Sequence, residues 1–229
     1  HTQNNNVAIG HSAMKTSTTG GTNVAIGDAA MRDGSGYFQC VAVGASAGED
    51  NTNTDLTAIG YHALKSNTGG DNTGVGHQVL DANTSGYNNT AIGKDAGGAN
   101  TTGVSNVFVG KNAGAGNTTG GRNICIGLNA GDAITTGNEN FVIGALSDVS
   151  NANNTKEIVL GYNLVGKGSR TFYVGADSGV YHGGNTTTWS TTSDRRIKKN
   201  IADNNEGLFL INQIAVKNFE YKTAEEIES

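Results

Sequence analysis

Ser193 and Lys198, five positions apart, are residue types that could support chemistry together. A serine hydroxyl is a weak nucleophile until a neighbouring base removes its proton. A lysine amine can serve as that base where burial lowers its pKa towards neutrality. The competing interpretation places Ser193 in a linker and makes Lys198 one of four solvated basic residues. The spacing alone leaves both interpretations open.

The segment around this pair differs from the rest of the chain. Residues 194–229 hold 13 of the 35 charged residues of the sequence, whereas the longer stretch before them is poor in charge. Such a change in composition marks a domain boundary. We therefore expect a linker over residues 183–193, with Trp189 as an anchoring aromatic, and the beginning of a small α+β module over residues 194–229.

Within that module, two local patterns predict secondary structure. Asn205 is suited to cap a helix that runs from Glu206 to about Ile214. Phe219 and Tyr221 alternate with charged residues, which predicts a strand.

Upstream of this segment, a short apolar motif that ends in glycine repeats along the chain. Its first copies are Val7-Ala8-Ile9-Gly10 and Val24-Ala25-Ile26-Gly27. Most steps between successive anchor glycines span 17 residues, two span 16 and the last spans 14, a regularity that chance does not produce. The anchor glycines are Gly10, Gly27, Gly44, Gly60, Gly76, Gly93, Gly110, Gly127, Gly144, Gly161 and Gly175.

Each repeat predicts a short strand, a turn and a polar ladder. β-Branched residues at the first and third motif positions alternate with a mostly small residue such as Ala25, which is the period-2 pattern of a strand. The small face suggests close packing against another coil or another chain. Asn recurs just before the strand, as at Asn106 and Asn123, where it suits a turn and can form ladders between stacked coils. Thr/Gly runs between the strands predict the outer turns.

These features predict an all-β fold, a repetitive parallel β-roll or β-solenoid of about 17 residues per repeat. We expect the regular repeats to span residues 1–150 and degenerate repeats to form a transition over residues 151–182. One repeat has too few apolar residues to bury its own strip, and stacked repeats remain thin. We therefore expect homotrimers, because association around an axis would bury apolar strips that a lone solenoid leaves exposed.

The repeats resemble the N-T/V-A-I-G-x-x-A arrays of viral and phage tail-fibre shafts. Downstream, Ser193-Asp194-Arg195-Arg196-Ile197-Lys198, followed by Asn200-Ile201, resembles the opening of the endosialidase-type intramolecular chaperone of trimeric viral fibres. That family promotes trimer assembly and then cuts itself from the fibre. The resemblance implies cleavage of the Ser193–Asp194 bond by a dyad of Ser193 and Lys198. This would be a single-turnover autoproteolysis of the chain's own backbone, which needs no substrate pocket.

The resemblance accordingly implies a structural component of a viral tail fibre or host-attachment fibre, located in the virion or outside the cell. Such a fibre would meet a receptor or glycan on the host surface. The alternative is a cell-surface adhesin, because the repeats are also similar to the heads of trimeric autotransporters. The charged module after Ser193 counts against that alternative. An ice-binding solenoid ranks lower, since Thr gathers in the turns. A glycan-acting enzyme also ranks lower, since no carboxylate pair stands out.

Composition excludes several other classes. Glycine accounts for 35 residues, and charged residues make up only 15% of the chain, which argues against an ordinary globular enzyme. The absence of proline excludes collagen and polyproline shafts. A pI near 5.5 without basic blocks gives no reason to expect a nucleic-acid partner. No apolar run approaches the ~18 residues of a membrane span, so no membrane insertion is expected. Because the sequence opens on His1, we expect a segment of a longer or processed protein.

No cofactor and no metal site is expected. His11 and His77 each follow an anchor glycine, and on a three-fold axis such a histidine could form a three-nitrogen metal site. A solvated turn residue is the alternative that we favour. Cys40 and Cys125 are five repeats apart, which at a strand spacing of about 4.8 Å is beyond the reach of a disulfide. We expect both cysteines to be small buried residues.

Overall fold

The computed structural model describes residues 5–17, 19–176, 180–183 and 189–191. The chain divides into two units, His1–Thr192 and Ser193–Ser229. The second unit lies outside the described residues, and with it lie the predicted helix from Glu206 and the predicted strand around Phe219.

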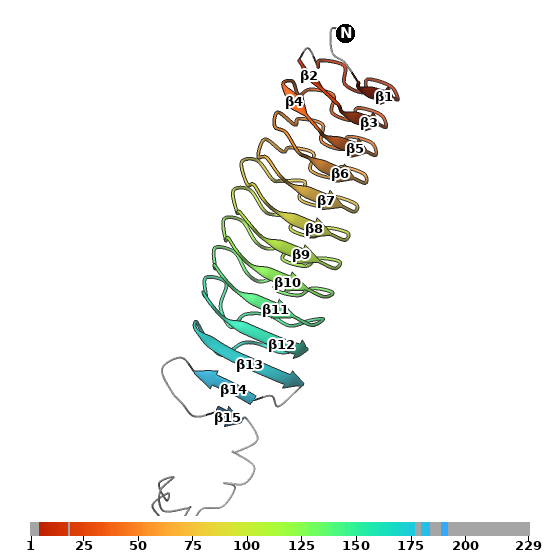
Figure 1. The fold of residues 1–229 in the computed structure, drawn as a ribbon. Coiled ribbons are helices and arrows are strands. Elements are labelled where there is room, and N and C mark those ends of the chain that lie inside the picture. Colours follow the sequence, from red (N-terminus) through yellow and green to blue (C-terminus); the bar gives the residue numbers. More distant parts are fainter. Residues whose placement is uncertain (1–4, 18, 177–179, 184–188, 192–229) are drawn as a thin grey trace, which may run out of the picture. The chain divides into compact units, whose positions relative to one another are not determined.

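The first unit is a parallel β-solenoid, in which each coil of chain contributes one short strand to a long sheet (Figure 1). The described residues form strands and turns and no helix, which confirms the prediction of an all-β solenoid of about 17 residues per coil. Eleven strands pair in parallel, and β14 and β15 continue the sheet in antiparallel pairing. The strands of this sheet are β1 (Val7–Ile9), β3 (Val24–Ile26), β5 (Val41–Val43), β6 (Thr57–Ile59), β7 (Thr73–Val75), β8 (Thr90–Ile92), β9 (Val107–Val109), β10 (Ile124–Ile126), β11 (Phe141–Ile143), β12 (Ile158–Tyr162), β13 (Thr171–Ala176), β14 (Val180–Gly183) and β15 (Trp189–Thr191).

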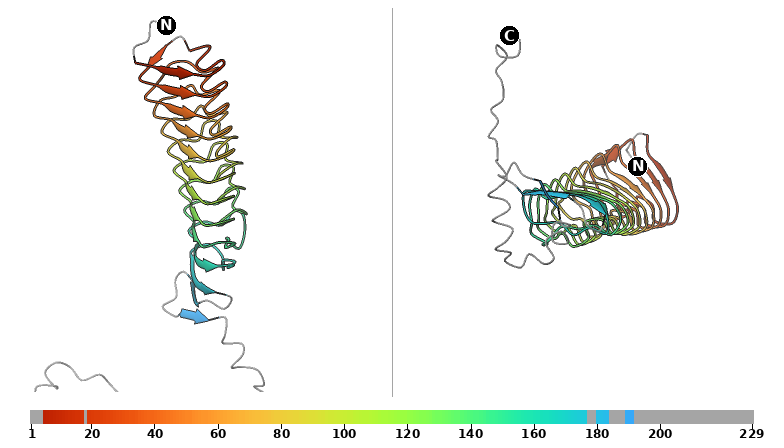
Figure 2. Two further views of the ribbon diagram at one scale, coloured as in Figure 1. Left: turned by 90° about the vertical axis from the view of Figure 1, so that its right-hand side faces the viewer. Right: turned by 90° about the horizontal axis from the view of Figure 1, so that it is seen from below.

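The pairing register equals the sequence period, so equivalent residues stack on one another. Val7 lies opposite Val24, and the shorter steps of the repeat leave the alignment intact, as where Val41 lies opposite Thr57. Figure 2 shows the strands of successive coils in one row. A second sheet of β2 (Gly20–Gly21) and β4 (Tyr37–Phe38) joins two outer turns near the N-terminal end.

An inner strand, by which we mean a parallel strand that lies between two others in the stack, has its central residue pointing into the coil. Ala25, Ala42 and Ala58 are fully buried, whereas their two neighbours in the strand keep part of their surface exposed. The small face of the strand therefore packs inside the solenoid rather than against another chain. The β-branched face points outwards.

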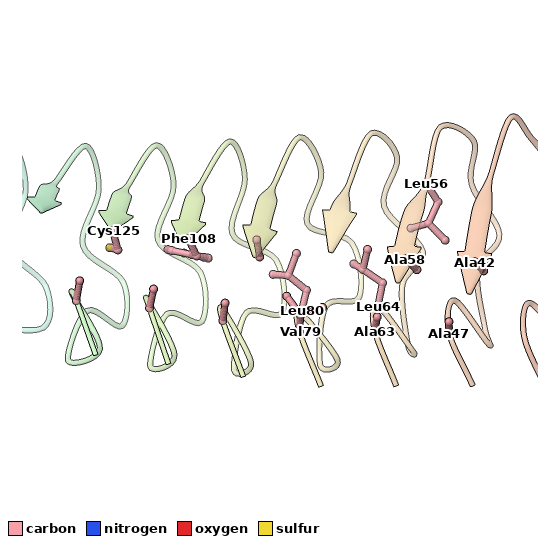
Figure 3. Close-up of a cluster of buried hydrophobic side chains, with 14 of the residues drawn as sticks. Ala42, Ala47, Leu56, Ala58, Ala63, Leu64, Val79, Leu80, Phe108 and Cys125 are labelled. Carbon is pink, nitrogen blue, oxygen red and sulfur yellow. The ribbon is translucent and has the colours of Figure 1, made fainter. Parts of the chain in front are cut away.

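The opposite wall of the core is built by the turn that follows each anchor glycine. After the anchor glycines from Gly27 to Gly127 the third and fourth residues are buried, as Ala63 and Leu64 are after Gly60. In Figure 3 these side chains point towards strand residues such as Ala58 across a narrow interior. The second and fourth residues of the turn have positive φ, 55° at His62 and 50° at Leu64, which curls the chain tightly.

The strand and the turn of a coil share the core volume, so that a small residue in one can be matched by a large residue in the other. Where the strand carries Ala58, the turn of the same coil carries Leu64, and where the strand carries Phe108, the turn carries Gly114. A Cβ atom on Gly97, in the preceding turn, would lie 2.7 Å from Cδ2 of Phe108, and one on Gly114 would also collide with the ring. The two glycines therefore make room for the one large aromatic side chain in this part of the core.

Two ladders of buried asparagines run along the stack. The first confirms the ladder predicted from the repeat, and the second was not predicted. In the first, Nδ2 of Asn106 donates to Oδ1 of Asn89 at 3.1 Å, and the same Asn106 Oδ1 accepts the main-chain N–H of Asn123 at 2.9 Å. Each rung thus satisfies the buried polar groups of the next. The rungs of this first ladder are Asn72, Asn89, Asn106, Asn123 and Asn140.

The second ladder stacks on the other side of the outer turn. Nδ2 of Asn100 donates to Oδ1 of Asn83 at 2.7 Å, and Asn117 donates to Asn100 at the same distance. Oδ1 of Asn117 is buried without a partner, because the next rung is Ile134. The rungs of the second ladder are Asn51, Asn67, Asn83, Asn100 and Asn117.

The first ladder ends at Glu157, which is fully buried. Its main-chain N–H donates to Oδ1 of Asn140 at 3.0 Å, as an asparagine rung would. Its carboxylate accepts the N–H of Gly168 at 2.8 Å and Nδ2 of Asn154 at 2.9 Å. The donors around this carboxylate supply the partners that a buried charge requires.

Candidate functional site: an uncharged outer face

The residues predicted to do chemistry lie outside the described part of the chain. Ser193, Asp194 and Lys198 all belong to the second unit, so the structure neither brings the serine and the lysine together nor separates them. The site that the described residues do present is a surface rather than a pocket.

That surface is the outer face of the long parallel sheet. Ile9, Ile59 and Ile92 are 58%, 39% and 44% exposed, and the other outward residues of the inner strands are partly exposed. A parallel sheet is ordinarily covered on both faces, and exposed apolar patches of this extent mark interaction sites. We call the outward residues of the eleven parallel strands the outer face. They are the first and third residues of each strand, and in β13 the second and fourth, which align with the first and third of β12.

The outer face carries no charge on any of the eleven parallel strands, and threonine is its only polar residue type. Uncharged, β-branched side chains in straight columns form a flat surface that another sheet could pack against. The outer face consists of Val7, Ile9, Val24, Ile26, Val41, Val43, Thr57, Ile59, Thr73, Val75, Thr90, Ile92, Val107, Val109, Ile124, Ile126, Phe141, Ile143, Ile158, Leu160, Phe172 and Val174.

One border of the outer face is the column of residues that follow the anchor glycines. His11 lies here, with Nδ1 3.1 Å from Oδ1 of Asp28 in the next coil, and both side chains are exposed. His77 stacks at 5.2 Å from the exposed ring of Tyr61. Both histidines are exposed residues of the turn.

Towards the C-terminal end this border becomes apolar, a feature that the repeat analysis missed. Leu128 and Tyr162 in this column are 46% and 59% exposed, and Leu146 and Val165, at other positions of the turns, are 43% and 58% exposed. The signal was present in the sequence, because Leu128 and Tyr162 stand in the same column as His11. Here the apolar surface is wider than the strands alone.

A group of charged residues lies further along the turns, at the fifth and sixth positions after the anchor glycines. Carboxylate oxygens of Asp33, Glu49 and Asp50 lie within 4.8 Å of one another, as metal ligands can. The Arg32 guanidinium already contacts Glu49 and lies 2.6 Å from Asp33, and Lys65 lies 3.9 Å from Glu49. The almost fully buried Glu49 is therefore neutralised by side-chain cations, and we interpret the group as an ion-pair network.

The two cysteines are free and buried, as expected. They occupy different positions in the coil, since Cys125 is the central residue of β10 and Cys40 precedes β5. Burial raises the pKa of both thiols, most strongly at Cys125. Thiols held protonated in this way are poor nucleophiles.

Comparison with protein-family models, with curated proteins and with solved structures gave no match. Within the described residues, no helix has the length and apolar content that crossing a bilayer requires.

Proposed function

We propose that this chain is a structural component of a viral, phage-like tail fibre or host-attachment fibre, whose solenoid assembles as a homotrimer through the outer face. The observation that carries the proposal is the extent of this face: two uncharged columns along eleven strands, with isoleucines up to 58% exposed. A monomer with such a surface would expose an aggregation-prone sheet to water.

The gain from covering the outer face is large enough to drive assembly. Burying the exposed part of a partly exposed valine or isoleucine gains up to about 1 kcal/mol. Two such positions on each of eleven strands give on the order of 15–20 kcal/mol per chain, above the roughly 4–15 kcal/mol that association costs. Three copies around an axis would enclose all the outer faces, and the resemblance to trimeric fibre shafts favours that number.

The proposal includes a C-terminal intramolecular chaperone that promotes trimer assembly and is released by autoproteolysis at Ser193–Asp194. Two observations support it: the resemblance of residues 193–201 to that family, and the division of the chain between Thr192 and Ser193, next to the proposed scissile bond. In the proposed dyad Lys198 would take the proton of the Ser193 hydroxyl and so activate it. Cleavage breaks the Ser193–Asp194 amide bond with the addition of one water, which leaves a carboxyl group on Ser193 and an amino group on Asp194, so the only substrates are the chain itself and water.

Intact mass tests the chaperone part of the proposal. The gene with its full C-terminal region and a Ser193→Ala variant would be expressed side by side and weighed under denaturing conditions. We expect the wild-type chain to end at Ser193 and the variant to remain uncut. A full-length wild-type product would refute autoproteolysis and favour the alternative, a trimeric autotransporter-like adhesin.

Sedimentation tests the assembly part with a matched pair of variants. Ile126→Lys places a charge in the middle of the outer face, and Thr119→Lys places the same charge on an exposed outer turn. We expect trimers for the wild type and for Thr119→Lys, and dissociated or aggregated chains for Ile126→Lys. Trimers of Ile126→Lys as stable as those of the wild type would rule out the outer face as the interface.

A further inference from the structure

The outer face has a second border, formed by the residues two positions before each strand from β3 to β12. These residues are exposed and stack from coil to coil. The main-chain N–H of Asp71 donates to the Thr54 carbonyl of the preceding coil at 3.4 Å, and that of Arg122 donates to the Val104 carbonyl at 2.9 Å. We call this column the leading border, and the column of residues that follow the anchor glycines the trailing border.

The two borders carry opposite charges in the middle of the stack. Asp55 and Asp71, on the leading border, precede β6 and β7. His77, Lys94 and Lys111, on the trailing border, follow β7, β8 and β9. The uncharged outer face therefore lies between an acidic edge and a basic edge.

Most of these charges have no partner within the chain. Nζ of Lys94 lies 3.4 Å from Oδ2 of the neighbouring Asp95. Asp55, Asp71 and Lys111 form no ion pair with any of the described residues. A single chain thus leaves charges of both signs available to a second molecule.

The coils nearer the C-terminal end show a different arrangement. There Glu139 of the leading border lies 3.0 Å from Arg122 and 3.6 Å from Lys156, so the charges of this border pair with one another. The trailing border of the same coils carries residues such as Leu128 and Tyr162 and no charge. The leading-border charges are therefore paired within the chain where the trailing border is apolar, and left unpaired near its basic residues.

We propose that the two borders form the seam between neighbouring copies of this chain, with the acidic residues of one leading border against the basic residues of the next trailing border. This inference rests on the proposed assembly through the outer face and names contacts of that assembly. Rotation about an axis parallel to the stack keeps every coil at its own height, so the leading border of one copy meets the trailing border of the next. Asp71 then lies level with His77 of a second copy and about 4.8 Å in height from its Lys94, one coil away.

The charge pattern also selects the relative direction of the copies. Antiparallel packing of two outer faces would bring each border against the same border of the other copy, acidic against acidic and basic against basic. Like charges in contact disfavour that arrangement, whereas parallel copies bring opposite charges together. The seam therefore favours parallel assembly.

Charge reversal tests the seam in the full chain, with assembly followed by sedimentation equilibrium. Asp55→Lys/Asp71→Lys gives both borders basic residues, and Lys94→Glu/Lys111→Glu gives both borders acidic residues. The quadruple variant reverses both borders at once. It restores opposite signs across the seam and keeps the net charge of the wild type.

The backbone accommodates the reversed residues. Lys156, on the leading border, has a φ of 59°, and Asp55 and Asp71 both have a φ of 58°. Asp28 shows that the trailing border accepts an acidic residue. Loss of assembly in a double variant therefore reports on the seam rather than on the fold of the coil.

We expect each double variant to need at least about tenfold higher concentration for half-assembly than the wild type, because the seam recurs at every contact between copies. The quadruple variant should recover most of that loss, and Thr102→Lys/Thr119→Lys, on exposed outer turns, should assemble like the wild type. The differences should narrow at about 1 M salt, where charges more than about 3 Å apart are screened.

Wild-type trimers with double variants of equal stability would overturn the seam and leave the outer face as the interface. A quadruple variant no better assembled than the double variants would also overturn the seam. A monomeric wild type would overturn both the seam and the assembly proposed through the outer face.

Discussion

Replacing Phe108 by alanine tests whether the solenoid core is filled by exchange between strand and turn. Phe108 is fully buried, and the glycines at 97 and 114 that border its ring have no side chains to move into the vacated space. A cavity that cannot collapse places the cost of Phe108→Ala in the upper range for such changes, about 3–5 kcal/mol of unfolding free energy.

The double variant Phe108→Ala/Gly114→Leu separates this explanation from a general preference for phenylalanine. It recreates the pairing of Ala58 with Leu64, in which the turn leucine fills the space that the strand alanine leaves. Leu64 has a φ of 50° and Gly114 one of 58°, so leucine can adopt the required backbone at a cost of about 1–2 kcal/mol. We therefore expect the double variant to recover at least about 1 kcal/mol of the loss.

Urea unfolding followed by circular dichroism would measure the unfolding free energy of Phe108→Ala, of the double variant and of Gly114→Leu. Gly114→Leu alone should be destabilised, because its side chain collides with the ring of Phe108. A double variant no more stable than Phe108→Ala would refute the exchange of volume between strand and turn.

Three further changes probe the polar core by the same urea assay. Asn106→Asp removes the Nδ2 donor of a buried rung and adds a charge, so we expect a loss of about 2–4 kcal/mol of unfolding free energy. The control Thr119→Ala, on the outer turn, should lose less than about 0.5 kcal/mol. Glu157→Gln places an amide nitrogen, itself a donor, next to the Gly168 N–H or Nδ2 of Asn154, so we expect a loss of about 1–3 kcal/mol of unfolding free energy. Equal stability of this variant and the wild type would show that the carboxylate is not needed there. Ile134→Asn extends the second ladder and supplies a donor to the unpaired Oδ1 of Asn117, so it should be more stable than Ile134→Ala, and the reverse order would contradict the ladder argument.

The strands and the first ladder could be predicted from the sequence because both depend on local repetition. The pattern that ends in Gly27 places a strand over Val24–Ile26, and the spacing of Asn106 and Asn123 places equivalent side chains one coil apart. The orientation of the strand could not be predicted in the same way. A period-2 pattern shows that two faces differ, but the usual expectation that the larger apolar face lies inside fails here. The interior beside Ala58 is too narrow for isoleucine once Leu64 fills it.

Features that break the repeat could not be recognised from the local pattern around each residue. Phe108 appears as one more central residue until it is compared with Gly114, six positions later. Asp148 and Glu157 look like ordinary charged residues in a degenerate region, although both are held by hydrogen bonds at the end of the regular stack. The proposed dyad of Ser193 and Lys198 lies beyond the described residues, so it stays a prediction.

The matched register of the sheet has a mechanical consequence. Hydrogen bonds between neighbouring strands run along the stacking direction, so each junction between coils carries the full tension applied along the stack. Each inner strand contributes three residues to such a junction, and the hydrogen bonds of the turns and of the asparagine ladders add to them, so a stretched solenoid would open coil by coil. Compression, in contrast, presses the same rungs together over the whole cross-section. A lone solenoid of this design therefore resists compression better than tension. A fibre that must bear tension needs neighbouring chains to share the load at each junction between coils.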